Sequence, residues 1–479
     1  MNTVNSSRSF RPRLTQGALS PSEVVAASLA NVAPAMSFMF SFAVVEQGAG
    51  LASGLTIALV ALAILFHANS ISQLSKKLPS SGSYITYVGK TFGPTAGVVI
   101  AILAAFGYII STAGLMAILG GWTAVILQKF AHIFIPWQLI TLFGVLGLGY
   151  LMIKGVKIST RWLVMGFFFE VAALVLVSVL VLFSPHTAFS LDAFNPAKLK
   201  GGLSGISLGF PIAIWMFTGV GNSMGLAEDT RNPRRVIPRS IFISLFFASV
   251  IYIFLSWVTT IGFHNNGSLI SHLSVPFVTL GASVLGPVAI IVYLAGFTST
   301  FAEIIGATNG QSRMLFSAGR DRLLPSFLSQ INRYRAPWAA LVFYLGIALT
   351  ITLIWGMHVG PMTLFGYLGT LAGIPIALIY LIVNLVVPVY YRRHYPREFR
   401  AGVHLWIPLL GVLTMIFPLA GLLGPGQKPP FSIFPWIVLG IIALSLLYAR
   451  FSVSRRQISV GEILADTMAD ADENASNAL

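Results

Sequence analysis

The chain has 479 residues, of which 56% are hydrophobic and only 9% are charged, and its formal net charge is +15. A soluble domain carries about 25% charged residues, so this composition excludes an ordinary soluble protein and indicates a surface that faces lipid. The positive charge suggests nucleic-acid binding, but the basic residues lie in short clusters between apolar stretches, as topology signals do, which excludes that function.

Apolar stretches of about 20 residues, each long enough to cross a membrane, recur along the chain. Few of them alternate strictly between apolar and polar residues, so they predict helices and an all-α polytopic membrane protein. Residues 1–21 are predicted to be a cytoplasmic segment without a cleavable signal peptide, and residues 451–479 a cytoplasmic tail that ends in acidic residues. The twelve predicted transmembrane helices cover residues 23–45, 52–72, 95–127, 136–154, 162–184, 204–226, 238–262, 286–310, 337–356, 361–391, 405–424 and 431–450.

The distribution of lysine and arginine predicts the orientation of these helices. If the N-terminus is cytoplasmic, all but four of the 29 basic residues lie on the inner side, the exceptions being Lys129, Lys198, Lys200 and Lys428. Basic residues are retained on the cytoplasmic side of short loops, so this bias predicts that both termini are cytoplasmic, in a plasma membrane such as the bacterial inner membrane.

Two predicted helices are interrupted near their middle. The first contains a proline within residues 31–37, and the sixth contains two glycines within residues 217–223. Proline costs about 3 kcal/mol in a helix interior and glycine about 1 kcal/mol, and broken backbone at membrane depth is tolerated only where protein or a water-filled cavity satisfies it. Interruptions at corresponding positions of two halves indicate an inverted-repeat transporter with its binding site at the midplane.

Three segments between predicted helices carry a family resemblance: residues 227–238, residues 78–84 and residues 312–321, the last followed by Leu324-Pro325. Together they resemble the cytoplasmic loops of the amino acid–polyamine–organocation permeases, over roughly residues 20–450. The resemblance implies the five-plus-five inverted-repeat fold of the leucine transporter. The implied units are residues 22–200 for the first repeat, 201–391 for the second, and 392–450 for two additional helices.

The interruptions define a candidate binding site for an amino acid. The N-terminus of a half-helix attracts a carboxylate, and the carbonyl groups at a C-terminus attract an ammonium group. The resemblance adds a tryptophan expected to close over the substrate and a tyrosine in the third helix. The candidate substrate-binding residues are Ala33, Ala35, Met36, Ser37, Tyr108, Trp215, Phe217, Thr218, Gly219, Gly221 and Asn222.

One of these positions departs from the family pattern. Several relatives, including arginine–agmatine exchangers, have a glutamate where this chain has Gly221. The absence of that carboxylate disfavours arginine, agmatine and polyamines, and favours a neutral or acidic substrate.

Two glutamates lie inside predicted helices, where ionisable residues are rare and functional by default. Glu170 and Glu303 each lie about 12–15 Å from the inner surface, at 1.5 Å per residue. In the resembling family this depth holds sodium or a lysine of the fifth helix, and Glu170 matches the lysine position. Because burial favours the neutral form of a carboxyl group, we expect Glu170 to carry a proton, with Glu303 as the second candidate. Sodium bound by Thr298, Ser299 and Thr300 is the alternative, and a purely structural, protonated glutamate is a further one.

These features predict a secondary active transporter that imports an amino acid by alternating access, coupled to protons, without other cofactors, as a monomer or homodimer. The alternatives are an exchanger of a precursor for its decarboxylated product, a polyamine carrier, and a membrane-embedded enzyme. The enzyme would need a convergent catalytic constellation, which the few non-basic polar residues do not supply. No histidine cluster has metal-ligand spacing, and no Walker-type glycine loop is present.

Overall fold

The computed structural model describes residues 20–80, 82–155, 160–185, 187, 189–423 and 427–456. Within these residues the chain is helical and contains no β-strand. The predicted N-terminal segment and acidic C-terminal tail lie almost entirely outside the described residues. The helices at the predicted transmembrane positions are α1 (Pro21–Val32) with α2 (Pro34–Ala49), α3 (Ser53–Lys77), α5 (Pro94–Ala131), α6 (Trp137–Ile153), α7 (Thr160–Leu182), α8 (Leu203–Met216) with η4 (Thr218–Asp229), α9 (Pro233–Gly262), α12 (Ile290–Arg320), α13 (Trp338–Gly356), α14 (Pro361–His394), α15 (Ile407–Gly421) and α16 (Phe434–Arg456).

The helices confirm a polytopic membrane protein. Nine helical segments of the described chain are long and apolar enough to cross a membrane, and the first of them, Pro21–Lys77, contains the first two predicted spans. The predicted fourth and sixth spans fall on the shorter apolar helices α6 and α8. Each of the twelve predicted spans therefore coincides with an apolar helix. The limits of the two predicted repeats stay a prediction.

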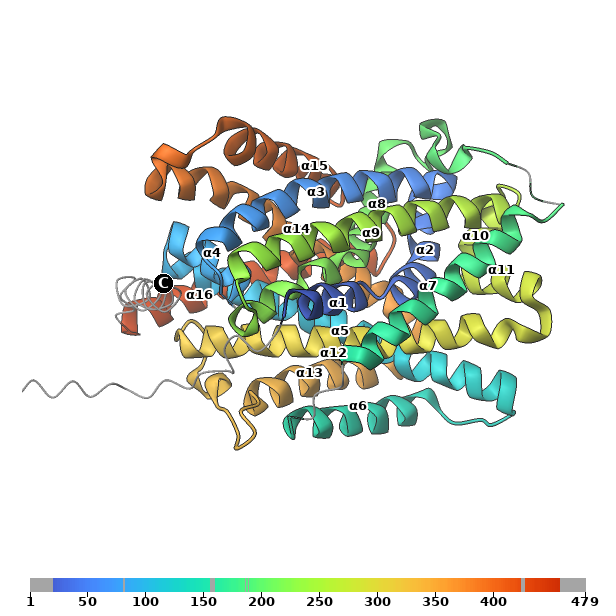
Figure 1. Cartoon of the computed structure of the whole chain (residues 1–479), viewed down its shortest axis with the longest axis horizontal. Coiled ribbons are helices and arrows are strands. Elements are labelled where there is room, and N and C mark those ends of the chain that lie inside the picture. Colours follow the sequence, from blue (N-terminus) through green and yellow to red (C-terminus); the bar gives the residue numbers. More distant parts are fainter. Residues whose placement is uncertain are drawn as a thin grey trace, which may run out of the picture.

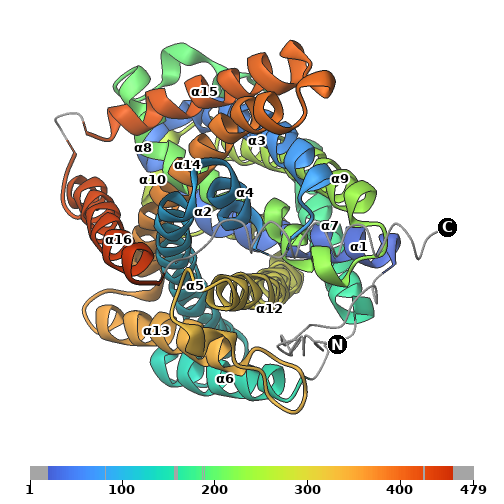
Figure 2. The same cartoon turned by 90° about the vertical axis from the view of Figure 1, so that its left-hand side faces the viewer.

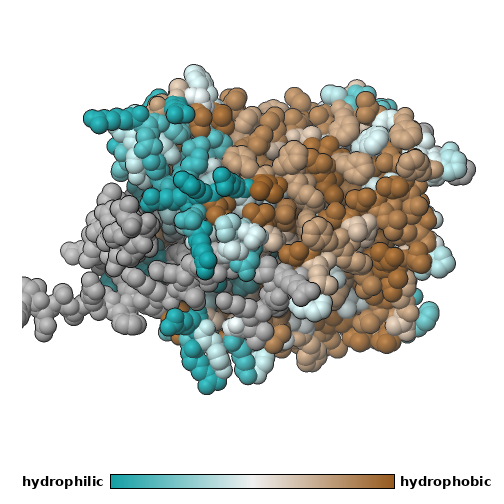
Figure 3. Space-filling model, in the orientation of Figure 1, coloured by the Kyte–Doolittle hydropathy of each residue, from teal (hydrophilic) through white to brown (hydrophobic). Residues whose placement is uncertain are grey.

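The helices run roughly parallel to one another and form a bundle (Figure 1). Seen along the bundle, α5 and α12 lie towards the middle, whereas α15 and α16 lie on the outside (Figure 2). Burial agrees with this arrangement, because 78% of the most apolar stretch of α5 is buried but only 22% of that of Phe431–Ser452, the segment that contains most of α16. The outer helices present apolar side chains to their surroundings, which produces the broad hydrophobic surface in Figure 3.

Hydrophilic residues gather at one end of the bundle, on the left in Figure 3. This end, called the basic face below, holds the end of α3, the short helix α4 (Ser83–Phe92), and the segment after α14. Lys77 forms an ion pair of 2.8 Å with Glu398, and the Arg393 guanidinium donates to the carbonyl of Thr91 at 3.0 Å. Two of the predicted cytoplasmic segments, those after α3 and at the end of α14, thus contact each other at this face.

The structure corrects the predicted limits of several segments. Residues 312–320, taken as part of a loop, belong to α12, which continues to Arg320. The short helices α4, α10 (Gly267–His272) and α11 (Pro276–Leu285) were not predicted. The prediction followed hydrophobic runs, and such runs end before a helix does when the helix continues beyond the membrane into polar residues.

Candidate functional site

The first interruption lies at a single residue between α1 and α2. Ala33 has a left-handed backbone conformation (φ 44°, ψ 60°), and Pro34 begins α2. Proline has no backbone N–H and disfavours the helical conformation in the residue before it, so the helix cannot continue through Ala33. The break predicted in this helix is therefore present, and it directs the N-terminus of α2 into the protein interior.

The second interruption lies after Met216, where α8 ends and the 3-10 helix η4 begins at Thr218. The Thr218 hydroxyl donates to the carbonyl of Trp215 at 2.9 Å, which satisfies one carbonyl at the end of α8. Gly219 lies so close to α1 that a Cβ atom there would overlap the carbonyl oxygen of Asn31. Only glycine permits this contact, which holds the two interruptions against each other.

Tyr252 of α9 joins the two interruptions through one hydroxyl group. Its oxygen lies 3.1 Å from the carbonyl oxygen of Val32 and 3.2 Å from that of Met216, and its ring packs edge-on against Phe217. Each carbonyl belongs to the last turn of a half-helix, whose carbonyl groups lack partners within the helix. Tyr252 was not among the residues predicted from the sequence. A tyrosine at the middle of a membrane-spanning helix was the signal that could have identified it.

We expect Tyr252→Phe to lower both stability and transport. The substitution leaves the Met216 carbonyl without this donor, whereas Val32 keeps the hydroxyl of Ser37 at 3.0 Å. Loss of a partner for one buried carbonyl costs about 1–3 kcal/mol. Thermal unfolding of the purified protein should show a lower apparent Tm. Tyr150→Phe, a matched change at a position 57% exposed on α6, should leave it unchanged. An unaltered Tm in Tyr252→Phe would contradict the bridging role.

Glu170 of α7 occupies the N-terminus of α2. Its Oε2 accepts a hydrogen bond of 3.2 Å from the backbone N–H of Ala35, and its side chain is 1% exposed. The next amide, that of Met36, donates to Ser299 Oγ of α12 at 2.9 Å, and the Ser299 hydroxyl faces the Glu170 carboxyl. A carboxylate is favoured at a helix N-terminus by the backbone N–H groups and the helix dipole.

Every early amide of α2 has a partner in this arrangement. Pro34 has no N–H, and the N–H of Ser37 donates to Ala33 within the turn at 2.9 Å. The amides predicted to receive a substrate carboxylate are thus held by Glu170 and Ser299. A substrate carboxylate at this helix end would have to take the place of one of these side chains.

Glu303 lies one turn beyond Ser299 on α12 and is 4% exposed. Its Oε2 has no hydrogen-bond partner among the described residues, and its carboxyl is close enough to interact electrostatically with the Glu170 carboxyl and the Tyr252 hydroxyl. The structure therefore brings the two predicted glutamates and Ser299 together.

The other two hydroxyl groups predicted on α12 are not part of this cluster. Thr298 donates to Leu294 and Thr300 donates to Gly296, both within α12. Residues of a helix are rotated by about 100° from one to the next, so three consecutive residues cannot all face one point. Of the three, Ser299 alone bonds across to α2.

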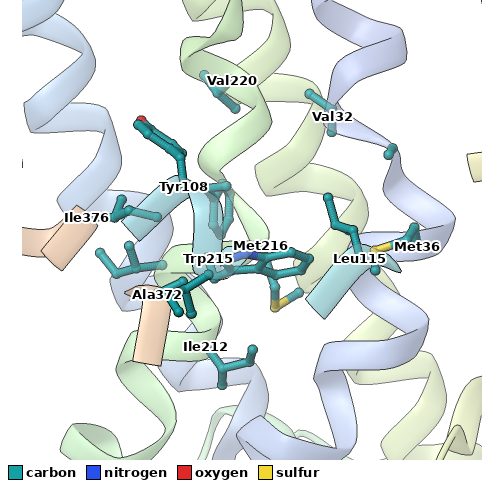
Figure 4. Close-up of a cluster of buried hydrophobic side chains, with 14 of the residues drawn as sticks. Val32, Met36, Tyr108, Leu115, Ile212, Trp215, Met216, Val220, Ala372 and Ile376 are labelled. Carbon is teal, nitrogen blue, oxygen red and sulfur yellow. The ribbon is translucent and has the colours of Figure 1, made fainter. Parts of the chain in front are cut away.

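The remaining candidate residues surround the interruptions. The Trp215 indole N–H donates to Ser111 Oγ at 2.7 Å, and its ring packs edge-on against Phe365. In the view of Figure 4, Trp215 lies between Ala372 and Leu115. Ser111, which orients this tryptophan, was also missed. Its position three residues after Tyr108 on the predicted third span was the available signal.

Tyr108 belongs to a buried group of phenols with Tyr84 of α4 and Tyr380 of α14. Gly221 borders this group, since a Cβ atom there would lie 2.8 Å from the Tyr84 hydroxyl. The Asn222 side chain lies outside the described part of the chain. The other candidate residues at the interruptions are buried, apart from the partly exposed Gly221. Access to the site from water therefore requires movement of the surrounding helices.

A membrane-embedded helical bundle with two adjacent broken helices at its centre is a transporter architecture. The chain belongs to the amino acid permease family, whose sequence model matches residues 19–447. It is similar to the branched-chain amino acid permease BcaP of Bacillus subtilis, with 25% identity over 83% of this chain and 86% of that protein.

Two further relatives show the breadth of the family. The human b(0,+)-type amino acid transporter 1 is 30% identical over 59% of this chain and 55% of the transporter. The methylthioribose transporter of Bacillus subtilis is 23% identical over 86% of this chain and 89% of that protein. The chain thus falls among transport proteins and not among enzymes, and the relatives include transporters of more than one kind of small molecule.

Proposed function

We propose that this protein is a secondary active transporter that imports a neutral amino acid across the plasma membrane together with a proton. The observation that carries the proposal is the Glu170 carboxyl at the N-terminus of α2, where the Ala35 amide donates to it. The group that would carry the proton and the helix end that attracts a substrate carboxylate are in direct contact. Proton and substrate can therefore influence each other's binding.

The coupling follows from competition for the same helix end. An ionised Glu170 satisfies the Ala35 amide and is stabilised by the partial positive charge of α2. Protonation removes the charge, weakens this interaction and frees the amide for the carboxylate of an amino acid. A proton thus promotes substrate binding, and release of substrate allows Glu170 to return to the helix end and lose its proton. By linkage, substrate must then raise proton affinity by the same factor.

The chemistry around the interruptions supports a neutral substrate. The carbonyls of Val32 and Met216, bridged by Tyr252, suit the ammonium group of an amino acid. The other side chains of this region are apolar and suit an apolar substrate side chain. Figure 4 shows them together with Trp215: Met36, Leu115, Ile212, Val220, Ala372 and Ile376. The similarity to a branched-chain amino acid permease agrees with such a substrate.

The positions of the hydroxyl groups on α12 favour a proton over a sodium ion as the coupling ion. A sodium ion in this cluster would need several oxygen ligands, but Thr298 and Thr300 are each rotated by about 100° from Ser299, and their hydroxyl groups lie against carbonyls of their own helix. Ser299 and the two glutamates remain, which is a small ligand set for a metal ion and a suitable one for a proton relay.

The proposed orientation places the basic face in the cytoplasm, with both termini on that side. It rests on the concentration of lysine and arginine in the segments that meet at this face, according to the positive-inside rule. Alternating access is the matching mechanism, because the buried site must open to each side in turn.

The proposal is tested with purified protein in liposomes. A proton gradient, acidic outside, should drive accumulation of L-leucine, L-isoleucine or L-valine in sodium-free buffer, and the uptake should acidify the lumen. Accumulation that needs sodium, or uptake that needs a counter-substrate inside the liposomes, would replace proton symport by sodium symport or by exchange. The absence of uptake of any amino acid would contradict the proposed substrate class.

A further inference from the structure

A polar cavity lies at the end of the bundle opposite the basic face. It has a volume of ≈ 650 Å³ and is formed where the C-terminal end of α2 meets residues 198–200 and the short helix α10. Figure 1 shows α10 beyond α2, far from α4. In the proposed orientation this cavity faces the outside. It lies along α2 from the interruption, since Glu46 follows Ala35 by a rise of about 16 Å at 1.5 Å per residue.

The cavity contains a buried carboxyl group without a hydrogen-bond partner. Glu46 is 1% exposed, and neither of its carboxyl oxygens has such a partner among the described residues. The Ser53 hydroxyl and the Lys200 ammonium face it, and Gly267 lies so close that a Cβ atom there would be 2.9 Å from Glu46 Oε1. A buried carboxylate whose oxygens accept no hydrogen bond is costly, so Glu46 is suited to receive a donor from a ligand.

Lys200 forms hydrogen bonds to the C-terminal end of α2 through both its backbone and its side chain. Its backbone N–H donates to the carbonyl of Ala49 at 3.0 Å, and its ammonium donates to the carbonyl of Gln47 at 3.1 Å. These contacts satisfy carbonyl groups that have no partner within the helix. Lys200 therefore fixes the cavity wall.

Two further basic side chains line the cavity, Lys198 and His272. Both are exposed, and neither makes a side-chain hydrogen bond or ion pair with another described residue. The cavity thus combines a buried acid whose oxygens accept no hydrogen bond from the described residues with exposed basic groups that can receive an anion. Such a pairing suits a ligand that carries an ammonium group and an anionic group, and disfavours a simple anion or a metal ion.

We propose that this cavity is a second, outer binding site for a small dipolar ion, in which Glu46 receives the ammonium group and Lys198 and His272 receive the anionic group. A free α-amino acid and the headgroup of an ethanolamine phospholipid share this chemistry. The choice of an amino acid rests on the proposed transport function. An amino acid held here would also connect α2 to α10, which the Gln47 side chain already joins by donating to the carbonyl of Ser271 at 3.0 Å.

The test counts bound L-leucine by equilibrium dialysis on the full chain in phospholipid-free detergent. We expect two leucine molecules per wild-type chain, one in Glu46→Gln and one in Gly221→Leu, which blocks the central site. The loss in Glu46→Gln should be restricted to the outer site, so the affinity of the remaining site should match that of the central site. Glu398→Gln, the same chemical change on the basic face, should still bind two.

A second pair of variants guards against misfolding of Glu46→Gln. Lys198 and His272 are exposed, so Lys198→Ala and His272→Ala should keep the elution profile and Tm of the wild type. Each should weaken leucine binding at the outer site by about tenfold, the loss expected for one charge-assisted contact of about 1.4 kcal/mol.

The outcomes of this experiment distinguish a free amino acid from a phospholipid headgroup as the ligand, and the outer site from the central transport site. Addition of phosphatidylethanolamine that displaces only the Glu46-dependent leucine identifies the lipid headgroup as an occupant of the same site. One leucine that depends on Glu46 but not on Gly221 upholds the outer site and contradicts the central one. If neither leucine nor phosphatidylethanolamine binding depends on Glu46, the outer site is wrong, whatever happens at the centre.

Discussion

Replacement of Gly221 by leucine is expected to abolish amino acid uptake while the protein still reaches the membrane. A Cβ atom at this position would lie 2.8 Å from the Tyr84 hydroxyl and 3.2 Å from the methyl group of Met224. The larger side chain must push η4 away from α4, and such overpacking costs about 1–3 kcal/mol. Since η4 follows directly on the second interruption, this shift disturbs the central site. Uptake of labelled leucine into liposomes should fall by tenfold or more.

The control for this prediction is a glycine with open space around it. Gly440 of α16 is exposed, and a Cβ atom there would meet nothing within 4 Å. Gly440→Leu should therefore transport as the wild type does. Gly221→Ala, a smaller change, should retain part of the activity and show whether volume is the cause. Unchanged uptake in Gly221→Leu, at wild-type abundance in the membrane, would exclude η4 from the transport site.

Glu170→Gln is expected to uncouple transport from the proton gradient. Glutamine keeps the shape of the side chain and an oxygen that can accept from the Ala35 amide, but it cannot bind and release a proton. A proton gradient should then no longer concentrate substrate, and the ratio of internal to external leucine should approach one. Exchange of labelled for unlabelled leucine at equal concentrations should persist, because it needs no net proton movement. The measurement is leucine accumulation and lumen acidification at several external pH values.

Two comparisons assign this effect to Glu170. Glu398→Gln changes a glutamate paired with Lys77 on the basic face, where an exposed ion pair contributes little, so coupling should be intact. Glu303→Gln tests the second carboxyl of the cluster. Accumulation that still follows the proton gradient in Glu170→Gln, but is lost in Glu303→Gln, would move the carrier role to Glu303.

Features that depend on local backbone chemistry could be predicted from the sequence. The break at Ala33 follows from Pro34, and the break after Met216 coincides with a cluster of glycines. Both are properties of a few adjacent residues. The twelve apolar helices follow in the same way from the length of hydrophobic runs.

Features that depend on how helices face one another could not be predicted. Tyr252 lies on α9, between two interruptions that are distant from it in sequence, and only packing brings its hydroxyl to both carbonyls. Similarly, three consecutive hydroxyl residues on α12 were equivalent candidates until the rotation of that helix selected Ser299. The use of the Ala35 amide by Glu170 is a third example, since it requires the relative positions of α2 and α7.

Because α12 is a single unbroken helix, a movement at the central site is transmitted along its whole length to the basic face. Ser299 is 21 residues from Arg320, a distance of about 32 Å along a straight helix. If protonation or substrate binding at the centre tilts this helix by about 5°, its end at the basic face moves sideways by about 3 Å over that length. A small change in the angle of α12 at the centre thus becomes a displacement large enough to reposition a whole side chain at the basic face. The arginines at the end of α12 are accordingly suitable places for a spectroscopic label that reports events at the centre.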